Sequence, residues 1–292
     1  MLRLKRPAWQ ISIVALWKVP YIMSKSKASC LQENTRMSGR LLGLVLFCCV
    51  LASAGAADFP QTIATVKKSV VGIGTWQKTR SPAVRFNGTG FIVGDGLSVI
   101  TNAHVLPPAL DGEKFEMLGI VIARGEQFEF RQASIVSVDR EHDLAHLLIK
   151  GAPLPALQLG DSAQMAEGRE LAFTGFPLGM VLGLHPVTHR ALLSAITPVV
   201  TPSLTSGKLN AGAIVQLQKA SFPVFQLDAT AYPGNSGSPV YDPQTGVVYG
   251  VINMVFVKGL KESAITNPSG ITYAVPAMHA RELLQRKNPS EK

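Results

Sequence analysis

Apolar residues along this chain occur in short runs that turn-forming residues separate. The run at 66–75 predicts a strand, and the runs at 90–93 and 98–100, joined by Gly94-Asp95-Gly96, predict a hairpin. Further strands are predicted at 118–123, 128–138 and 144–149. The first half of the chain is therefore predicted to consist of short strands.

The second half continues this pattern and ends in a helix. Strands are predicted at 170–177, 191–200, 214–217 and 224–228, with loops at 179–186 and 201–212. Residues 277–284 have helical character and place Leu283 or Leu284 against the strands. With 7% aromatic residues, 26 glycines and 19 prolines, the composition suits many strands joined by turns rather than a helical bundle.

Residues 1–56 are predicted to be an N-terminal extension with a signal peptide. A basic residue at 40, an apolar run at 41–52 and small residues at 53–57 predict secretory cleavage after Ala54 or Ala56. The alternative is an uncleaved segment that anchors the protein in a membrane. The protein is accordingly expected to be exported, to the periplasm or the exterior.

Residues 1–36 contain seven basic residues and one acidic residue, and they precede the expected signal peptide. A signal peptide belongs at the extreme N-terminus, so translation is predicted to start at Met37. A basic, acid-poor organelle transit peptide is the alternative interpretation.

Removal of residues 1–56 changes how charge and cysteine are interpreted. The whole chain has a net charge of +9, but eight of its 28 basic residues and one of its 19 acidic residues precede residue 57, which leaves about +2. A nucleic-acid partner is therefore not expected. Cys30, Cys48 and Cys49 also precede the cut, so disulfides, a thiol nucleophile and Cys-ligated metals are excluded from the mature chain.

The candidate chemistry centres on Ser236, in the stretch Tyr232 to Val240. Glycines on both sides favour a tight turn that exposes the hydroxyl, although a polar hairpin turn is the plain alternative. A serine nucleophile needs a base and a group that orients the base. His104 and Asp143 supply these types in the order His, Asp, Ser. Ser238 replaces the second glycine of a GxSxG elbow and excludes that motif.

Six blocks of sequence resemble, in order, the trypsin-like protease domain of HtrA/Deg serine proteases. They are Gly88–Val93, Ile100–Val105, Asp143–Ala145, Gly175–Gly179, Gly234–Gly237 and Gly270–Pro276. The resemblance implies an all-β fold of two six-stranded antiparallel barrels with a short C-terminal helix. The protease domain is expected at 57–292, with barrels at about 60–159 and 165–276 and the helix at 277–286.

The resemblance also implies roles for particular residues. Ser236 would attack the scissile carbonyl, His104 would act as the base, and Asp143 would orient His104. Backbone N–H groups of Gly234 and Ser236 would form the oxyanion hole. The base of the primary substrate pocket is expected at Thr230 and its wall at Ile252 and Asn253. No carboxylate stands at that base, so an apolar pocket for Val, Leu or Ala is expected rather than one for Lys or Arg.

Several alternatives remain open on the sequence alone. Glu141 lies two residues before Asp143 and competes with it as the orienting carboxylate. His142 and His146 are spaced like a metal pair, but they lack the glutamate of an HExxH motif and the stretch has the pattern of a strand, so no metal is expected. Where relatives have Gly-Gly-Pro after the serine, this chain has Gly-Ser238-Pro, which puts the detail of the neighbouring pocket in doubt.

The expected activity is hydrolysis of peptide bonds in exported or misfolded proteins, without a cofactor. The alternatives are a catalytically silent relative that binds peptides in a chaperone-like way, and an esterase on the same scaffold. Only 16 residues follow Pro276, so the PDZ domain of many relatives is not expected. The expected partners are peptides or unfolded proteins, with a membrane only through the signal segment, and a homo-oligomer remains open.

Overall fold

The computed structural model describes residues 58–125, 127–179, 183–198, 222–254 and 270–286. The described residues belong to one compact unit. The predicted signal segment, the strand predicted at 214–217 and the loop predicted at 201–212 lie outside the described residues.

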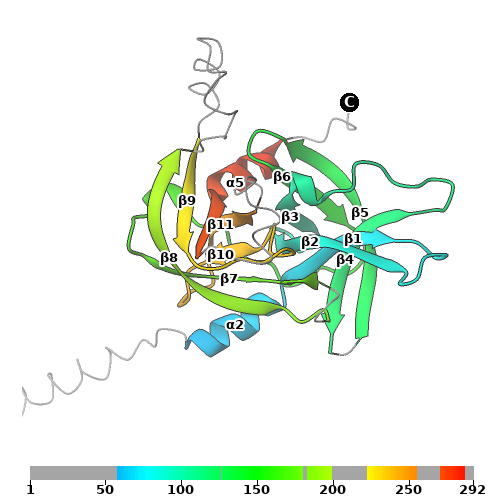
Figure 1. Ribbon diagram of the computed structural model, residues 1–292, viewed down its shortest axis with the longest axis horizontal. Helices are drawn as coiled ribbons and strands as arrows, with labels where there is room; N and C mark the ends of the chain where they lie inside the picture. The colour runs from blue at the N-terminus through cyan, green and yellow to red at the C-terminus, as the bar shows by residue number, and fades with distance from the viewer. Residues whose placement is uncertain (1–57, 126, 180–182, 199–221, 255–269, 287–292) are drawn as a thin grey trace, which may run out of the picture. The chain divides into compact units, whose positions relative to one another are not determined.

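Six strands of the first half close into an antiparallel barrel (Figure 1). They are β1 (Val70–Trp76), β2 (Val84–Val93), β3 (Ser98–Asn102), β4 (Met117–Arg124), β5 (Gln127–Asp139) and β6 (Leu144–Ile149), in the order β1-β2-β3-β6-β5-β4. Aliphatic side chains such as Ile73, Ile92 and Leu147 are fully buried together inside it. Their removal from water is the main stabilising contribution of this barrel.

The second half forms another closed six-stranded barrel. Its strands are β7 (Glu170–Gly175), β8 (Val187–Pro198), β9 (Pro223–Asp228), β10 (Pro239–Tyr241), β11 (Val248–Asn253) and β12 (Ile271–Pro276), in the order β10-β11-β12-β9-β8-β7. Phe173, Phe225 and Ile252 lie in its core. The predicted two-barrel, all-β fold is therefore confirmed.

The N-terminal helix α2 (Phe59–Lys67) was not predicted, because the run from Val66 was interpreted as a strand. That interpretation is wrong for Val66, which is buried on the helix, and β1 begins only at Val70. Pro60 explains the difference, since its fixed φ suits the first turn of a helix and its missing N–H costs nothing there. The helical turns then bury Thr62 and Val66 four residues apart, on one face.

The C-terminal helix α5 (Ala277–Gln285) is confirmed and lies between the barrels, against β5, β6 and β11 (Figure 1). Leu283 is fully buried, whereas Leu284 is partly buried. Two three-residue 3₁₀ helices, η1 (Ala103–Val105) and η2 (Ser162–Gln164), complete the described elements. Among the described residues, no helix is long and apolar enough to cross a membrane.

An imidazole pair joins α5 to the turn between β5 and β6. The ring of His279 stacks on that of His142, with centroids 3.7 Å apart and planes 17° apart, and Phe222 packs edge-on against both rings. Burial lowers the pKa of His279, and the neighbouring His142 lowers it further, against the opposite pull of Glu282 and Asp139. Burial also lowers the pKa of His146.

Stability is expected to fall as the pH drops below about 6.5, the ordinary pKa of histidine in an unfolded chain. A histidine whose pKa is lowered in the folded state binds a proton mainly in the unfolded state. It therefore leaves the free energy of unfolding unchanged above about pH 6.5 and lowers it increasingly below that pH. Each such histidine contributes at most about 1.4 kcal/mol per pH unit. Urea unfolding at pH 8, 7, 6 and 5 should show this slope, and His279→Gln should reduce it. An unchanged slope in that variant would contradict the explanation.

Candidate active site

His104 and Asp143 are brought together by the pairing of β3 with β6. Asn102, the last residue of β3, pairs with Leu144, the first residue of β6. His104 follows on η1, and Asp143 directly precedes β6. The carbonyl oxygen of Asp143 accepts hydrogen bonds from the Ala103 N–H and the Asn102 Nδ2, both at 3.0 Å. The register of one strand pair thus sets the separation of the two residues.

Asp143 accepts three hydrogen bonds through its carboxylate. Oδ1 accepts from the His104 backbone N–H at 2.9 Å, and Oδ2 lies 2.5 Å from His104 Nδ1. Asn253 Nδ2 donates to Oδ2 as well, at 2.9 Å. A carboxylate only accepts, so Nδ1 of His104 carries a hydrogen, and in the neutral ring Nε2 is then the acceptor. The arrangement fixes both the orientation and the tautomer of the ring.

Ser236 lies in the turn between β9 and β10, opposite the free nitrogen of His104. Its Oγ is 3.0 Å from His104 Nε2, and the residue is 6% exposed. The turn is tied to both barrels, because Thr89 of β2 donates its N–H to the Ser236 carbonyl at 2.9 Å and Gly237 donates to Ile252 on β11 at 2.9 Å. The site therefore lies at the junction of the barrels, and all three residues predicted for the triad meet there.

Gly234 occupies a position that only glycine adopts without strain. Its φ is +101°, and a Cβ there would lie 2.3 Å from the carbonyl oxygen of Phe176. The Thr89 hydroxyl donates to the Gly234 carbonyl at 2.7 Å and so fixes this peptide. Within the part of the chain that the structure describes, neither Gly234 N–H nor Ser236 N–H donates to a protein acceptor.

Two of the three residues predicted for the substrate pocket have buried side chains on β11. Ile252 is fully buried in the core of the second barrel. The side chain of Asn253 is buried and donates to Asp143. These inward positions of β11 fill the barrel and support the site, and the pocket itself stays a prediction. Thr230, two residues after β9, is half-buried.

Asn253→Ala is expected to lower kcat roughly 10-fold to 100-fold, because a hydrogen bond to a charged group contributes about 1.5–3 kcal/mol. Without the Asn253 side-chain amide, Oδ2 of Asp143 loses one of its two hydrogen-bond donors. Steady-state kinetics would measure this, with KM nearly unchanged because Asn253 is buried. Asn253→Asp serves as the comparison. It keeps the side-chain volume but places a second carboxylate beside Asp143, so its kcat should be lower than that of Asn253→Ala.

The residues that the sequence offers as an alternative carboxylate or as a metal pair make other contacts. Glu141 is exposed, and its N–H donates to Asp139. His142 stacks on His279, whereas His146 lies 3.1 Å from the Ser98 hydroxyl. In the described ranges, no group of three or more His, Cys, Asp or Glu side chains is arranged to hold a metal ion.

Ser238 lies beneath the nucleophile turn, not in a substrate pocket. It is fully buried, and a Cβ on Gly175 would come within 1.9 Å of its hydroxyl oxygen. The neighbouring Asn235 is also fully buried. Neither the Ser238 hydroxyl nor the side-chain amide of Asn235 has a hydrogen-bond partner among the described residues. The departure from the sequence of relatives therefore affects packing under the turn rather than the triad.

Sequence reasoning missed the residues that hold the site from a distance. Thr89 contacts Gly234 across 145 positions, and Asn253 contacts Asp143 across 110. Thr101 donates its hydroxyl to the Thr89 carbonyl at 2.7 Å. The only local sign of these roles in the sequence is that Thr89 and Thr101 lie within the blocks Gly88–Val93 and Ile100–Val105.

Two closed six-stranded barrels with a Ser, His and Asp arrangement at their junction define the chymotrypsin-like class of protein. A family model described as a trypsin-like peptidase domain matches residues 88–251, more than half of the chain. The chain belongs to the trypsin-like peptidase family.

Similar proteins agree with this membership. Human serine protease HTRA4 is 26% identical over 200 residues, which are 68% of this chain and 34% of that protein. A probable periplasmic serine endoprotease, DegP-like, of Halomonas elongata is 28% identical over 189 residues, 65% of this chain and 32% of that protein. The chain thus spans about a third of the length of these relatives. The structure of the HtrA-type protease AlgW with decapeptide shares the fold, with a TM-score of 0.56 at 22% identity, covering 78% of this chain and 67% of that one.

Proposed function

We propose that this chain is a serine endopeptidase in which Ser236 is the nucleophile, His104 the general base and Asp143 the orienting carboxylate. The observation that carries the proposal is the continuous chain of contacts: Ser236 Oγ lies 3.0 Å from His104 Nε2, and His104 Nδ1 lies 2.5 Å from Asp143 Oδ2. Both distances are within hydrogen-bond reach, as proton transfer from the serine requires.

In the proposed reaction, Ser236 Oγ attacks the scissile carbonyl while its proton passes to His104 Nε2. Asp143 stabilises the resulting imidazolium. The N–H groups of Gly234 and Ser236 stabilise the negative oxygen of the tetrahedral intermediate, a role that suits donors that have no acceptor among the described residues. His104 then gives the proton to the leaving amine, and water repeats the sequence to release the acyl group.

The proposed substrates are peptide bonds of unfolded or misfolded exported proteins. Thr230 is proposed at the base of the primary pocket, where the absence of a carboxylate favours a small apolar residue before the cut. Export is supported by the signal-peptide pattern before residue 57 and by the periplasmic description of a DegP-like relative. Mapping cut sites in an unfolded protein would reveal mainly Arg or Lys before the cut if the pocket assignment is wrong.

Labelling with a fluorophosphonate tests the nucleophile directly, because this reagent needs an activated serine but no particular substrate sequence. The purified chain should gain one label by intact mass, and Ser236→Ala should gain none. Ser194→Ala, which removes an exposed serine on β8, is the matched control and should label like the wild type. A folded wild-type protein that takes no label would favour the silent peptide-binding alternative.

A further inference from the structure

Two adjoining pockets flank Phe86 beside the triad. One, of about 530 Å³, has Arg80, Pro82, Leu178 and Gly234 in its lining. The other, of about 460 Å³, has His104, Leu106 and Glu116 in its lining. Arg85, Phe86 and Asn87 of β2 line both pockets, which together are called the Phe86 groove below. The groove therefore reaches both the proposed oxyanion donor and the proposed base.

The position of the Phe86 groove assigns it to the part of a substrate that follows the scissile bond. His104 must reach the leaving amine in order to protonate it, so the chain beyond the cut has to pass His104. The groove begins there and is bordered mainly by β2 and the segment after His104 in the first barrel. Thr230, by contrast, belongs to the second barrel, on the acyl side.

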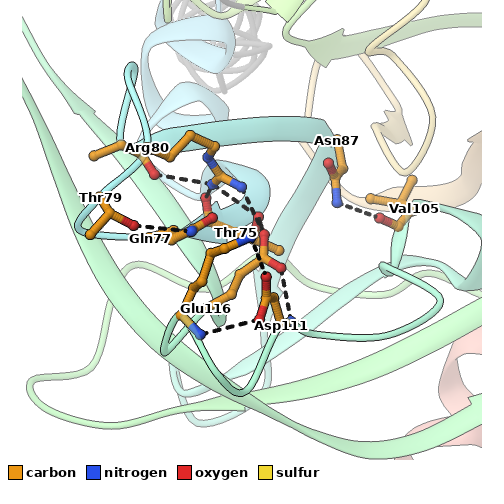
Figure 2. A network of polar contacts seen from close by, with 10 residues as sticks. Thr75, Gln77, Thr79, Arg80, Asn87, Val105, Asp111 and Glu116 are labelled. Atoms are coloured by element: carbon orange, nitrogen blue, oxygen red, sulfur yellow. Dashed lines mark hydrogen bonds and ion pairs between the residues drawn. The ribbon is translucent and has the colours of Figure 1, made fainter.

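The walls of the groove are held rigidly. Asn87 Nδ2 donates to the Val105 carbonyl at 3.1 Å, which ties β2 to the segment after His104 (Figure 2). Arg80 donates to the carbonyls of Thr75 and Ala83 at 2.6 and 3.0 Å. Phe86 packs edge-on against Phe176, with centroids 6.0 Å apart. The groove is thus preformed and needs little ordering when a peptide binds.

The charges on the groove leave one arginine uncompensated. Glu116 forms an ion pair with Arg80 at 2.7 Å and also accepts from the Thr75 hydroxyl and the Asp111 N–H (Figure 2). The Thr75 hydroxyl, followed by Arg80 and the Asp111 N–H, lowers the pKa of Glu116 to about 2, so it stays ionised and cancels Arg80. Arg85 is exposed, and no carboxylate contacts it within the described ranges.

We propose that Arg85 selects substrates with Asp or Glu two or three residues after the scissile bond. The spacing follows from β2: a Cβ on Gly88 would lie 3.1 Å from the Ser236 carbonyl oxygen, so Gly88 is next to the nucleophile. Arg85 is three residues further along the strand, roughly 10 Å away, and an extended substrate advances by the same amount per residue. A guanidinium binds a carboxylate through two parallel hydrogen bonds. The inference rests on the peptidase activity proposed above.

The test maps cleavage of a reduced, unfolded protein mixture by mass spectrometry and then compares matched peptides. Asp and Glu should be enriched at the second or third residue after the cut. On peptides that differ only there, the wild type should favour Asp over Lys by about threefold to tenfold in kcat/KM. Arg85→Gln should abolish the preference, and Arg85→Glu should reverse it. Arg124→Gln changes an exposed arginine of β4 outside the groove and should leave the preference intact.

Labelling of the wild type separates this inference from the proposed function. Suppose the wild type labels at Ser236, but its cut sites show no enrichment, or a depletion, of Asp and Glu at the second or third residue after the cut. The role of Arg85 is then wrong, while Ser236 remains the nucleophile. If Arg85→Glu keeps the preference for Asp, the role of Arg85 is also wrong. A folded wild type that does not label overturns the peptidase activity, and the inference falls with it.

Discussion

Asp143→Asn is expected to lower kcat by roughly 1,000-fold to 10,000-fold while the protein remains folded. The carboxylate accepts from three donors, the His104 N–H, His104 Nδ1 and Asn253 Nδ2. An asparagine amide offers one oxygen and one NH₂, so at least one of these donors would face another donor. If that donor is His104 Nδ1, the ring is driven to the tautomer that carries its hydrogen on Nε2 and cannot accept the proton of Ser236.

The backbone should tolerate this substitution. Asp143 has φ +54°, in the left-handed region, where asparagine is accommodated as readily as aspartate. Asp95→Asn is the matched control, because Asp95 is exposed and uses one side-chain oxygen, which asparagine retains, to accept from Leu97 and Ser98. Kinetics and circular dichroism of both variants would measure the difference. Near-normal kcat in Asp143→Asn would remove Asp143 from the triad and reopen the case of Glu141.

Gly234→Ala is expected to lower kcat roughly 100-fold to 1,000-fold, the usual loss when one oxyanion donor is misplaced. The new Cβ would lie 2.3 Å from the Phe176 carbonyl, and alanine is strained at a φ of +101°. The peptide must shift, and its N–H then moves from the position where the negative oxygen develops. KM should change little, since the ground-state carbonyl needs this donor less than the transition state does.

Gly112→Ala provides the control for the loss of a glycine. A Cβ at Gly112 meets nothing within 4 Å, and this residue has no positive φ, so activity and stability should stay close to those of the wild type. A thermal melt of Gly234→Ala would show how much of its effect is folding. If this variant is folded and turns over substrate at the normal rate, Gly234 does not supply an oxyanion donor.

Many of the strands, though not β10, β11 and β12, and the identity of the reacting residues are predictable from local patterns. Runs such as 118–123 and 144–149 alternate with turn residues closely enough to place β4 and β6 within one or two residues. Ser236, His104 and Asp143 stand out because a serine nucleophile requires those types and the surrounding blocks occur in order. Helix α2 escaped prediction, because Val66 extends an apolar run whose continuation in β1 is a true strand.

The sequence by itself determined many of the short strands, the chain order of His104, Asp143 and Ser236, and the glycine at 234, because these are read from local runs and short blocks of residues. The two-barrel class followed from the resemblance of those blocks, taken in order, to a known family. Only the tertiary structure decided that Asn253 donates to Asp143, that Ile252 fills a core, and that Arg85 borders a groove beside the nucleophile. These facts depend on barrel closure and strand register, which place residues more than 100 positions apart in contact. Such contacts leave no periodic trace in the sequence, since each involves a single side chain at each end.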